Sequence, residues 1–436
     1  MTSASRTASR CANDADYPEG AGMSQGRLIV ACDFGTTTFR ALVTEIFANG
    51  DLEIVGYSVQ AAEGFQDGDF VDLSSASRCI AKTIRALEQD SDIYVTGFTY
   101  NISGTHLRSV RSTAQVPIGP GPRPIRAADI EEVHNRARSM AIPFDHKILT
   151  VTPVEYAVDR VRGVVDPMGR VGSQLEMQAH LITGSRSVLH NIENAIETAK
   201  YKPLGEEVDV LATAESLLSA EDRDKGVILV DIGGLTTNWA VYRKGAIMAT
   251  GLVPLGGLHL STDLAHGLRI PQETAEDVKI KRGVVLRSLV EEVAVDVLFD
   301  QEKPEETPGL VAAILEPRVE EIFTYVKNDC GDSRELANLG AGVVLTGGGS
   351  RCRGTRQLCE EVFDLPVTRR HLPARLRGAD RLPSGQWATV LGLSMWAAGD
   401  FHAGVESEPG GRGGGLLGRL RGMFRRGPQE VLEAEA

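Results

Sequence analysis

The stretch Leu28-Ile-Val-Ala-Cys-Asp-Phe-Gly-Thr-Thr-Thr38 decides the fold of this chain. Its apolar half predicts a buried strand, and the turn around Gly35 leads into an alternating run from Phe39 to Ile46. The pattern predicts a β-hairpin with Asp33 at the end of the first strand, beside small glycine and threonine residues.

The same pattern occurs a second time further along the chain. Val227-Ile-Leu-Val-Asp-Ile-Gly-Gly-Leu-Thr-Thr237 is followed by the alternating run Trp239-Ala-Val-Tyr242. A third apolar run, Gly342-Val-Val-Leu-Thr346, ends in Gly347-Gly-Gly-Ser350 and precedes a helical stretch over Gly354–Val362. Two copies of one hairpin predict a duplicated α/β fold with a cleft between two lobes.

These turns have the composition of phosphate-binding loops. Glycine lets the backbone approach phosphate oxygens, which accept hydrogen bonds from main-chain N–H groups, and threonine hydroxyls add further donors. The carboxylates of Asp33 and Asp231 can hold the waters of a Mg²⁺ ion, which keeps several of them. A single turn of this kind is most often an ordinary hairpin, whereas three in this order favour a nucleotide site.

Composition excludes several classes of protein. The chain has 436 residues, of which 42% are apolar and 24% charged, so it is globular and large enough for two or more domains. The net charge of -13 argues against a nucleic-acid partner. No apolar run has the length of a membrane span. The six cysteines form no CxxC pair and no secretory signal precedes them, so we expect a reducing cytoplasm.

The three loops, in this order, resemble those of the actin, Hsp70 and sugar-kinase superfamily of ATP-binding folds. More specific stretches, from about residue 27 to 398, resemble the bacterial cell-division family FtsA. These stretches are Ser103-Gly-Thr-His106, Pro153-Val-Glu-Tyr-Ala-Val-Asp159, His180-Leu-Ile-Thr183, Pro254-Leu-Gly-Gly-Leu-His-Leu-Ser-Thr-Asp-Leu-Ala265, Ala275-Glu-Asp-Val-Lys-Ile-Lys-Arg-Gly283 and Glu316-Pro-Arg318.

The resemblance implies ATP and Mg²⁺ as ligands and a role for each candidate residue. Glu276 and Lys279 would face the ribose and adenine. Asp33 and Asp231 would hold Mg²⁺ through water. The phosphate loops would be formed by Gly35, Thr36, Thr37, Gly233, Gly234 and Thr236, with Gly347, Gly348 and Gly349 near the α-phosphate and base.

Two positions bear on turnover. Leu235 stands where the second loop of the family usually has a third glycine, so we expect its side chain to weaken nucleotide use. The carboxylate that orients attacking water in hydrolysing relatives would fall near Asp209. The alternative for Asp209 is the N-cap of a helix. We therefore expect an ATP-binding structural protein with slow or no hydrolysis.

The resemblance also implies a two-lobed actin-like fold of duplicated ribonuclease H-like domains. Residues 1–26 are predicted to be a disordered extension, and translation starts at Met1 or Met23. The globular divisions are a first lobe at 27–91 and 170–225, an inserted α+β subdomain at 92–169, a second-lobe core at 226–267 and 340–398, and an outer subdomain at 268–339. After them come a flexible linker at 399–415, an amphipathic helix at 416–427 and an acidic tail at 428–436.

The tail predicts an interfacial membrane anchor. On a helical projection its apolar face is Leu416, Leu417, Leu420, Met423 and Phe424, flanked by Arg419, Arg421, Arg425 and Arg426. The alternative is a helix that docks onto the body or onto a partner.

The function implied by the resemblance is mechanical. The protein would self-associate into filaments. It would bind the C-terminal peptide of FtsZ at residues 268–339 and so tether FtsZ to the anionic inner face of the cytoplasmic membrane, at the division septum. Late division proteins would bind 92–169. The alternatives are an adaptor of another membrane machine, of the pilus-assembly type, and a small-molecule kinase on the same fold.

Overall fold

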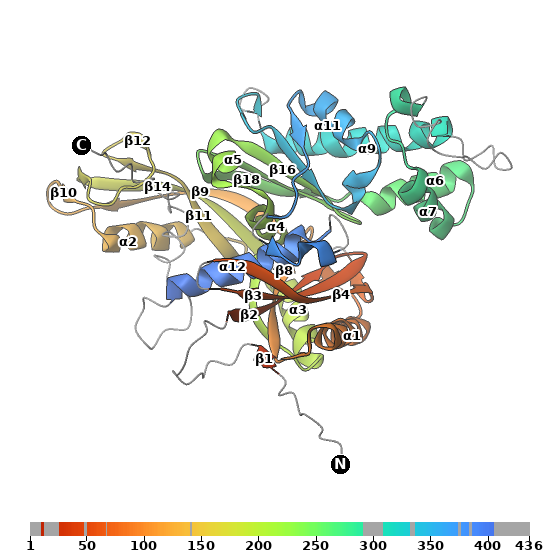
Figure 1. Cartoon of the computed structure of the whole chain (residues 1–436). Coiled ribbons are helices and arrows are strands. Elements are labelled where there is room, and N and C mark those ends of the chain that lie inside the picture. The colour runs from red at the N-terminus through yellow and green to blue at the C-terminus, as the bar shows by residue number, and fades with distance from the viewer. Residues whose placement is uncertain are drawn as a thin grey trace, which may run out of the picture.

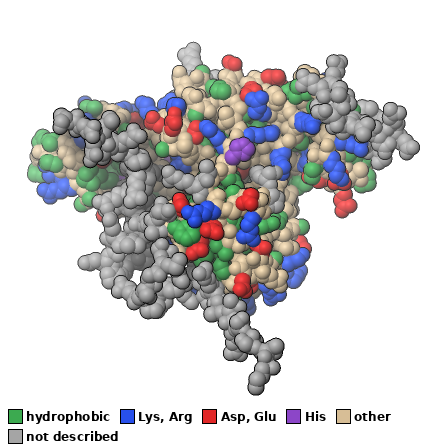
Figure 2. All heavy atoms as spheres, in the orientation of Figure 1, with side chains coloured by type: hydrophobic (Ala, Val, Ile, Leu, Met, Phe, Trp, Pro, Cys, Tyr) green, Lys and Arg blue, Asp and Glu red, His purple; other side chains and the backbone are tan. Residues whose placement is uncertain are grey.

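The computed structural model describes residues 10–12, 26–47, 50–66, 68–139, 142–290, 308–331, 336–373, 376–382 and 386–404. Figure 1 shows two lobes, one above the other, and a smaller unit that projects to one side. Acidic and basic side chains lie side by side over much of the face seen in Figure 2.

The first lobe is built on a six-stranded sheet. Its central hairpin is the one predicted around Asp33, and the register pairs Phe34 with Phe39 across the turn. In order across the sheet, the strands are β15 (Lys202–Val208), β8 (Gly97–Ile102), β2 (Arg27–Phe34), β3 (Thr38–Ile46), β4 (Leu52–Ala61) and β21 (Leu376–Arg377).

Helices cover both faces of this sheet, which explains why β2 is apolar without alternation. Val30 and Cys32 pack toward α1 and α3, whereas Ile29 and Ala31 pack toward α12 on the opposite face. These helices are α1 (Leu73–Ser91), α3 (Arg186–Thr198) and α12 (Ala388–Gly404).

The second lobe repeats the arrangement on a five-stranded sheet. Its strands, in order, are β18 (Ala246–Val253), β17 (Thr237–Arg243), β16 (Val227–Ile232), β19 (Val343–Thr346) and β20 (Val367–Thr368). One face packs against α6 (Gly257–Leu268), α7 (Gln272–Arg282), α9 (Pro308–Cys330) and α11 (Thr355–Phe363). The other face packs against α4 (Asp209–Leu217), which also contacts α12 of the first lobe.

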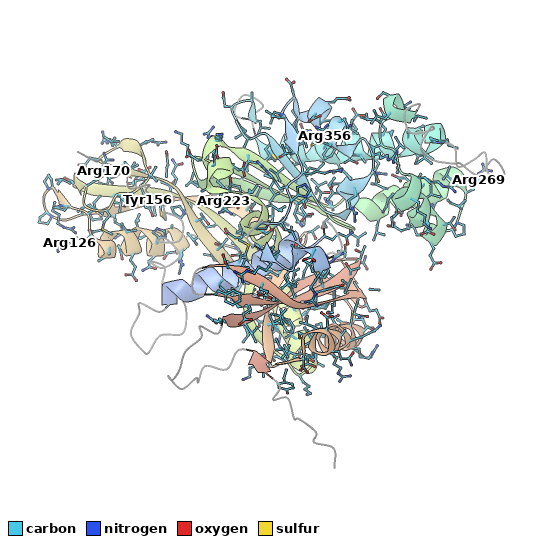
Figure 3. All side chains as sticks on the ribbon, in the orientation of Figure 1. Arg126, Tyr156, Arg170, Arg223, Arg269 and Arg356 are labelled. Atoms are coloured by element: carbon cyan, nitrogen blue, oxygen red, sulfur yellow. The ribbon has the colours of Figure 1, made fainter. Side chains whose placement is uncertain are left out.

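The projecting unit is a four-stranded antiparallel sheet with one helix. Its strands, in order, are β12 (Val161–Val164), β11 (His146–Val158), β14 (Gln174–Ser185) and β9 (Arg108–Pro117), and α2 (Ala127–Arg138) covers one face. Tyr156 lies between the strands and α2 (Figure 3), where its hydroxyl is 2.7 Å from Nε2 of the buried His134.

Short elements complete the described chain. They are β1 (Arg10–Ala12), β5 (Phe65–Gln66), β6 (Asp69–Phe70), β7 (Ile93–Val95), β10 (Arg123–Pro124), β13 (Val171–Gly172), α5 (Ala220–Lys225), η1 (Arg287–Leu289), η3 (Gly348–Arg351) and η4 (Ala379–Arg381).

The sheet pairings correct three of the predicted boundaries. First, β7 and β8 fall within the predicted insert at 92–169, but β8 pairs in parallel with β2 in the first lobe. The insert sheet instead extends through β14 to Ser185. Second, β21 and α12 fall within the predicted second-lobe segment 340–398 but pack on the first-lobe sheet. Third, Arg10–Ala12, predicted to be disordered, form β1 and pair with the edge strand β7.

The predicted anchor at 416–427, the acidic tail at 428–436 and most of the linker at 399–415 lie outside the described residues. None of the helices in the described part of the chain combines the length and the apolar character that a membrane span requires.

Candidate functional site

The structure brings the candidate residues together in a single cleft of about 560 Å³ between the two lobes. The cleft is lined by every residue predicted to bind nucleotide or metal and by Asp209. The predicted set is Asp33, Gly35, Thr36, Thr37, Asp231, Gly233, Gly234, Thr236, Glu276, Lys279, Gly347, Gly348 and Gly349.

The two hairpin loops have the same turn and face each other across the cleft. The N–H of Gly35 donates to the carbonyl of Thr38 (3.1 Å), and the N–H of Gly233 donates to the carbonyl of Thr236 (2.8 Å). A Cβ on Gly234 would lie 2.6 Å from Cγ2 of Thr37, which is too close for any side chain. The absence of a side chain at position 234 therefore lets the loops meet.

The third loop depends on a glycine for a different reason. Gly347 has a φ of 88°, in the left-handed region, and a Cβ there would lie 2.3 Å from Oδ1 of Asp231. This glycine therefore lets the third loop pass directly beside the second aspartate.

Glu276 and Lys279 are held on the second lobe by a compact hydrogen-bond network. Nζ of Lys279 donates to the carbonyl of Gly257 (2.8 Å) and forms an ion pair with Glu276 (2.7 Å). The hydroxyl of Ser261 also donates to Glu276. The N–H of Gly257 in turn donates to the carbonyl of Gly233 (2.8 Å). The network ties these two side chains to the second loop.

Three carboxyl groups face the cleft: Asp33 and Asp209 are buried, and Asp231 is partly buried. Burial raises the pKa of Asp33 to about 6, against the opposing effect of Arg40. Burial and then the charge of Asp33 raise the pKa of Asp231 to about 7. The pKa of Asp209 is raised by burial and by both other aspartates. Three carboxyl groups thus lie close together in the cleft, with Arg40 beside Asp33.

The donors suit a hydrated divalent cation. In the described part of the chain, no three ligating side chains converge to hold a metal ion directly. Mg²⁺ usually keeps several waters and takes only one or two protein carboxylates, and Asp33 and Asp231 can supply these. A divalent cation would also favour the charged forms of both carboxylates, against the burial that raises their pKa values.

The sequence analysis missed two side chains that occupy matching places in the repeat. In each hairpin, the residue paired with the aspartate across the strands points into the cleft: Arg40 opposite Asp33, and Asn238 opposite Asp231. Arg40 lies 3.7 Å from Asp33 and donates to Oε1 of Gln386 (2.6 Å). The hairpin register alone could have identified both positions.

One alternative from the sequence is wrong, and one expectation stays a prediction. Val208, rather than Asp209, is the N-cap of α4, and the carboxylate of Asp209 accepts hydrogen bonds from the side-chain amides of Asn101 and Asn238. Leu235 is not among the described residues that line the cleft, and its N–H donates to Oγ1 of Thr36 (3.1 Å). The effect of Leu235 on nucleotide use stays a prediction.

Comparisons with known proteins agree with this geometry. A family model described as an SHS2 domain inserted in FTSA matches residues 104–183, and one described as cell division protein FtsA matches residues 228–392. The chain is 33% identical to cell division protein FtsA of Pseudomonas aeruginosa over 380 residues, covering 86% of this chain and 90% of that protein. It is also 33% identical to the Neisseria meningitidis protein of the same name over 410 residues, covering 91% of this chain and 98% of that one.

Solved structures resemble the fold at much lower identity. The PilM-PilN type IV pilus biogenesis complex matches with a TM-score of 0.58 and 16% identity, covering 84% of this chain and 98% of that one.

Two lobes around a cleft lined by a duplicated Asp-Gly-Thr hairpin define a protein of the actin-like class. The matches over most of the chain then identify the family: the chain belongs to the FtsA family of bacterial cell-division proteins.

Proposed function

We propose that this protein binds ATP with Mg²⁺ in the cleft between its lobes. The observation that carries the proposal is the meeting of the two hairpin loops, joined by the hydrogen bond from Leu235 to Thr36. The loops would receive the phosphates, Asp33 and Asp231 would hold the hydrated metal, and Glu276 and Lys279 would face the ribose and base. Nucleotide would act by closing the cleft and shifting the population of lobe arrangements.

We propose further that the protein self-associates and tethers FtsZ filaments to the inner face of the cytoplasmic membrane at the division septum. Family membership supports this role. The C-terminal peptide of FtsZ would bind the outer subdomain at 268–339, of which α7 and α9 are described. The insert sheet from β9 to β14 would contact late division proteins.

The membrane contact would come from the tail at 416–427. Each basic residue near an anionic leaflet contributes about 1 kcal/mol. The few apolar side chains insert only partly and add a few kcal/mol more. A single tail binds weakly, but several tails in one filament bind well because later attachments are intramolecular. Self-association and membrane attachment would thus depend on each other.

The test is co-sedimentation of the purified full chain with vesicles that contain anionic lipid, with and without FtsZ and with ATP–Mg²⁺. The matched variant ends at Gly415 and lacks the anchor. We expect the full chain, but not the shortened one, to carry FtsZ down with the vesicles.

Other outcomes would refute the proposal that the protein tethers FtsZ to the membrane. If the full chain sediments with vesicles but leaves FtsZ in solution, an adaptor for another membrane machine becomes the better account. If neither chain binds vesicles, the tail has another role. Saturable phosphate transfer to a small hydroxyl compound would then be assayed as the sign of a kinase.

A further inference from the structure

The side-chain amide of Gln386 lies between the first hairpin and the third loop. Gln386 comes just before α12 and lines the cleft together with Arg40 and Gly348. Its Oε1 accepts from Nη2 of Arg40, on β3 of the first lobe (2.6 Å). On its other side, a Cβ on Gly348 of the third loop would lie 3.1 Å from Nε2 of Gln386. One amide therefore faces both lobes.

Packing and an ion pair hold this amide in place. The next residue, Trp387, is 2% exposed and packs edge-on against Tyr57 of the first-lobe sheet, with ring centroids 5.2 Å apart. Arg40 is also held, because only 12% of its side chain is exposed and its guanidinium lies 3.7 Å from the carboxylate of Asp33. The position of Gln386 is thus set before any ligand binds, which lowers the entropy that binding must overcome.

The chemistry of arginine decides which way the amide points. A guanidinium has N–H donors and no acceptor, so the atom of Gln386 that faces Arg40 must be the oxygen. The NH₂ group is therefore directed toward the side of Gly348. Gln386 is partly buried, and within the described part of the chain no group accepts a hydrogen bond from its Nε2. Its N–H donors are left for a group in the cleft.

Donors beside a cation suit an anionic oxygen. Because the amide oxygen already accepts from a cation, the amide is polarised and its N–H groups become stronger donors. A ligand group with no acceptor would leave these donors unpaired. The phosphates of a nucleotide present only acceptor oxygens, and they carry the charge that Arg40 attracts.

The neighbours of the third loop indicate which phosphate is meant. A Cβ on Gly257 would lie 3.4 Å from Cα of Gly349 and 3.5 Å from Nζ of Lys279. The third loop therefore adjoins the side chains that are proposed to face the ribose and base. A phosphate beside this loop is the one attached to the ribose.

We propose that Gln386 binds the phosphate attached to the ribose, and that Arg40 fixes the amide so that its NH₂ group donates to an oxygen of this phosphate. The inference rests on the proposed binding of ATP in the cleft. It makes Gln386 a ligand-binding residue and Arg40 its positioning residue. The contact forms with ATP, ADP and AMP, which all carry this phosphate, and cannot form with adenosine.

The experiment compares these four ligands on the full chain. Gln386→Met keeps the length of the side chain but has no N–H donor. Gln386→Glu keeps an oxygen for Arg40 and places a second oxygen where the NH₂ group was. Gln89→Met, on the exposed side of α1, is the matched control. Calorimetric titration gives the Kd for ATP–Mg²⁺ and ADP–Mg²⁺, NMR titration gives the Kd for AMP and adenosine, and thermal unfolding tests the fold.

We expect Gln386→Met to bind ATP, ADP and AMP about 10- to 100-fold more weakly, the scale of one hydrogen bond to a charged group. It should bind adenosine as the wild type does. Gln386→Glu should bind the three phosphorylated ligands more weakly still, because its carboxylate would face the phosphate. In the wild type, the ¹⁵N side-chain signal that is missing from Gln386→Met should shift with AMP and stay in place with adenosine.

Several results would overturn the inference. Gln386→Met could bind AMP as tightly as the control does, or the signal of Gln386 could stay in place when AMP is added. A loss confined to ATP and ADP would mean that Gln386 acts only through Arg40 on the outer phosphates. A loss for adenosine as well would mean general damage to the cleft. Tighter binding by Gln386→Glu than by Gln386→Met would mean that only the oxygen matters.

The two proposals can fail separately. If the wild type binds ATP and any of these results is found, the inference about Gln386 fails and the binding proposal stands. If the wild type binds none of the four ligands, both fail.

Discussion

Replacement of Gly347 by alanine should damage the cleft by an amount that the structure defines. The residue has a φ of 88° and a ψ of 163°, a region that almost only glycine adopts, so an alanine held there costs about 1 to 3 kcal/mol. The new Cβ would also lie 2.3 Å from Oδ1 of Asp231 and 2.3 Å from the carbonyl of Ile232, where ordinary contact begins at 3.4 Å. Forced movement of this kind in a packed site costs about 1 to 3 kcal/mol more.

Gly245 is the matched control, because its φ is 77° but nothing lies within 4 Å of the Cβ it would gain. Gly245→Ala should lose only the backbone contribution, about 1 to 2 kcal/mol of unfolding free energy, and bind ATP normally. Gly347→Ala should lose about 2 to 6 kcal/mol and bind ATP more than about 10-fold more weakly, because Asp231 is displaced. Urea unfolding and calorimetric titration measure the two quantities. Equal values for the two variants in both assays would refute the reasoning.

Three further predictions concern single side chains. Arg40→Ala should weaken ATP binding at least about 10-fold by removing a charged donor from an acidic cleft, and Arg40→Lys should restore part of the affinity in the same titration. Because burial and Asp33 raise the pKa of Asp231 to about 7, the folded protein keeps a proton that the unfolded chain releases near its ordinary pKa. Urea unfolding should therefore show stability falling from about pH 4 to pH 7, and Asp231→Asn should flatten that fall. Tyr156→Phe should lower the unfolding free energy by about 1 to 3 kcal/mol because it leaves the buried His134 without a partner, whereas Tyr94→Phe, 58% exposed, should change it little.

The parts of the fold that the sequence predicts are local ones. Both hairpins consist of two adjacent strands and a tight turn, so their pattern contains all the information that they need. The third loop likewise follows a short apolar run directly. The repetition of the hairpin suggests a cleft between two lobes, and the resemblance to the superfamily implies that the residues of all three loops line it.

The missed parts depend on contacts between distant segments. β8 is a short strand buried along its whole length, so it has no alternation to show which sheet it joins. The two donors to Asp209, Asn101 and Asn238, come from different lobes, and nothing near either residue in the chain indicates the other. The position of Arg40 could have been predicted from the sequence, because the hairpin register pairs it with Asp33.

The position of α12 has a consequence for how the protein folds during its synthesis. Ile29 and Ala31, near the start of the chain, are covered by Val390 and Leu391 of this last described helix. At typical rates of synthesis, the residues between them take roughly 20 to 70 s to emerge from the ribosome. Throughout that interval one face of the first sheet has no native cover, so the first lobe is begun early and finished last. A nascent chain stalled before α12 should therefore expose this face to chaperones and proteases, however complete the second lobe has become.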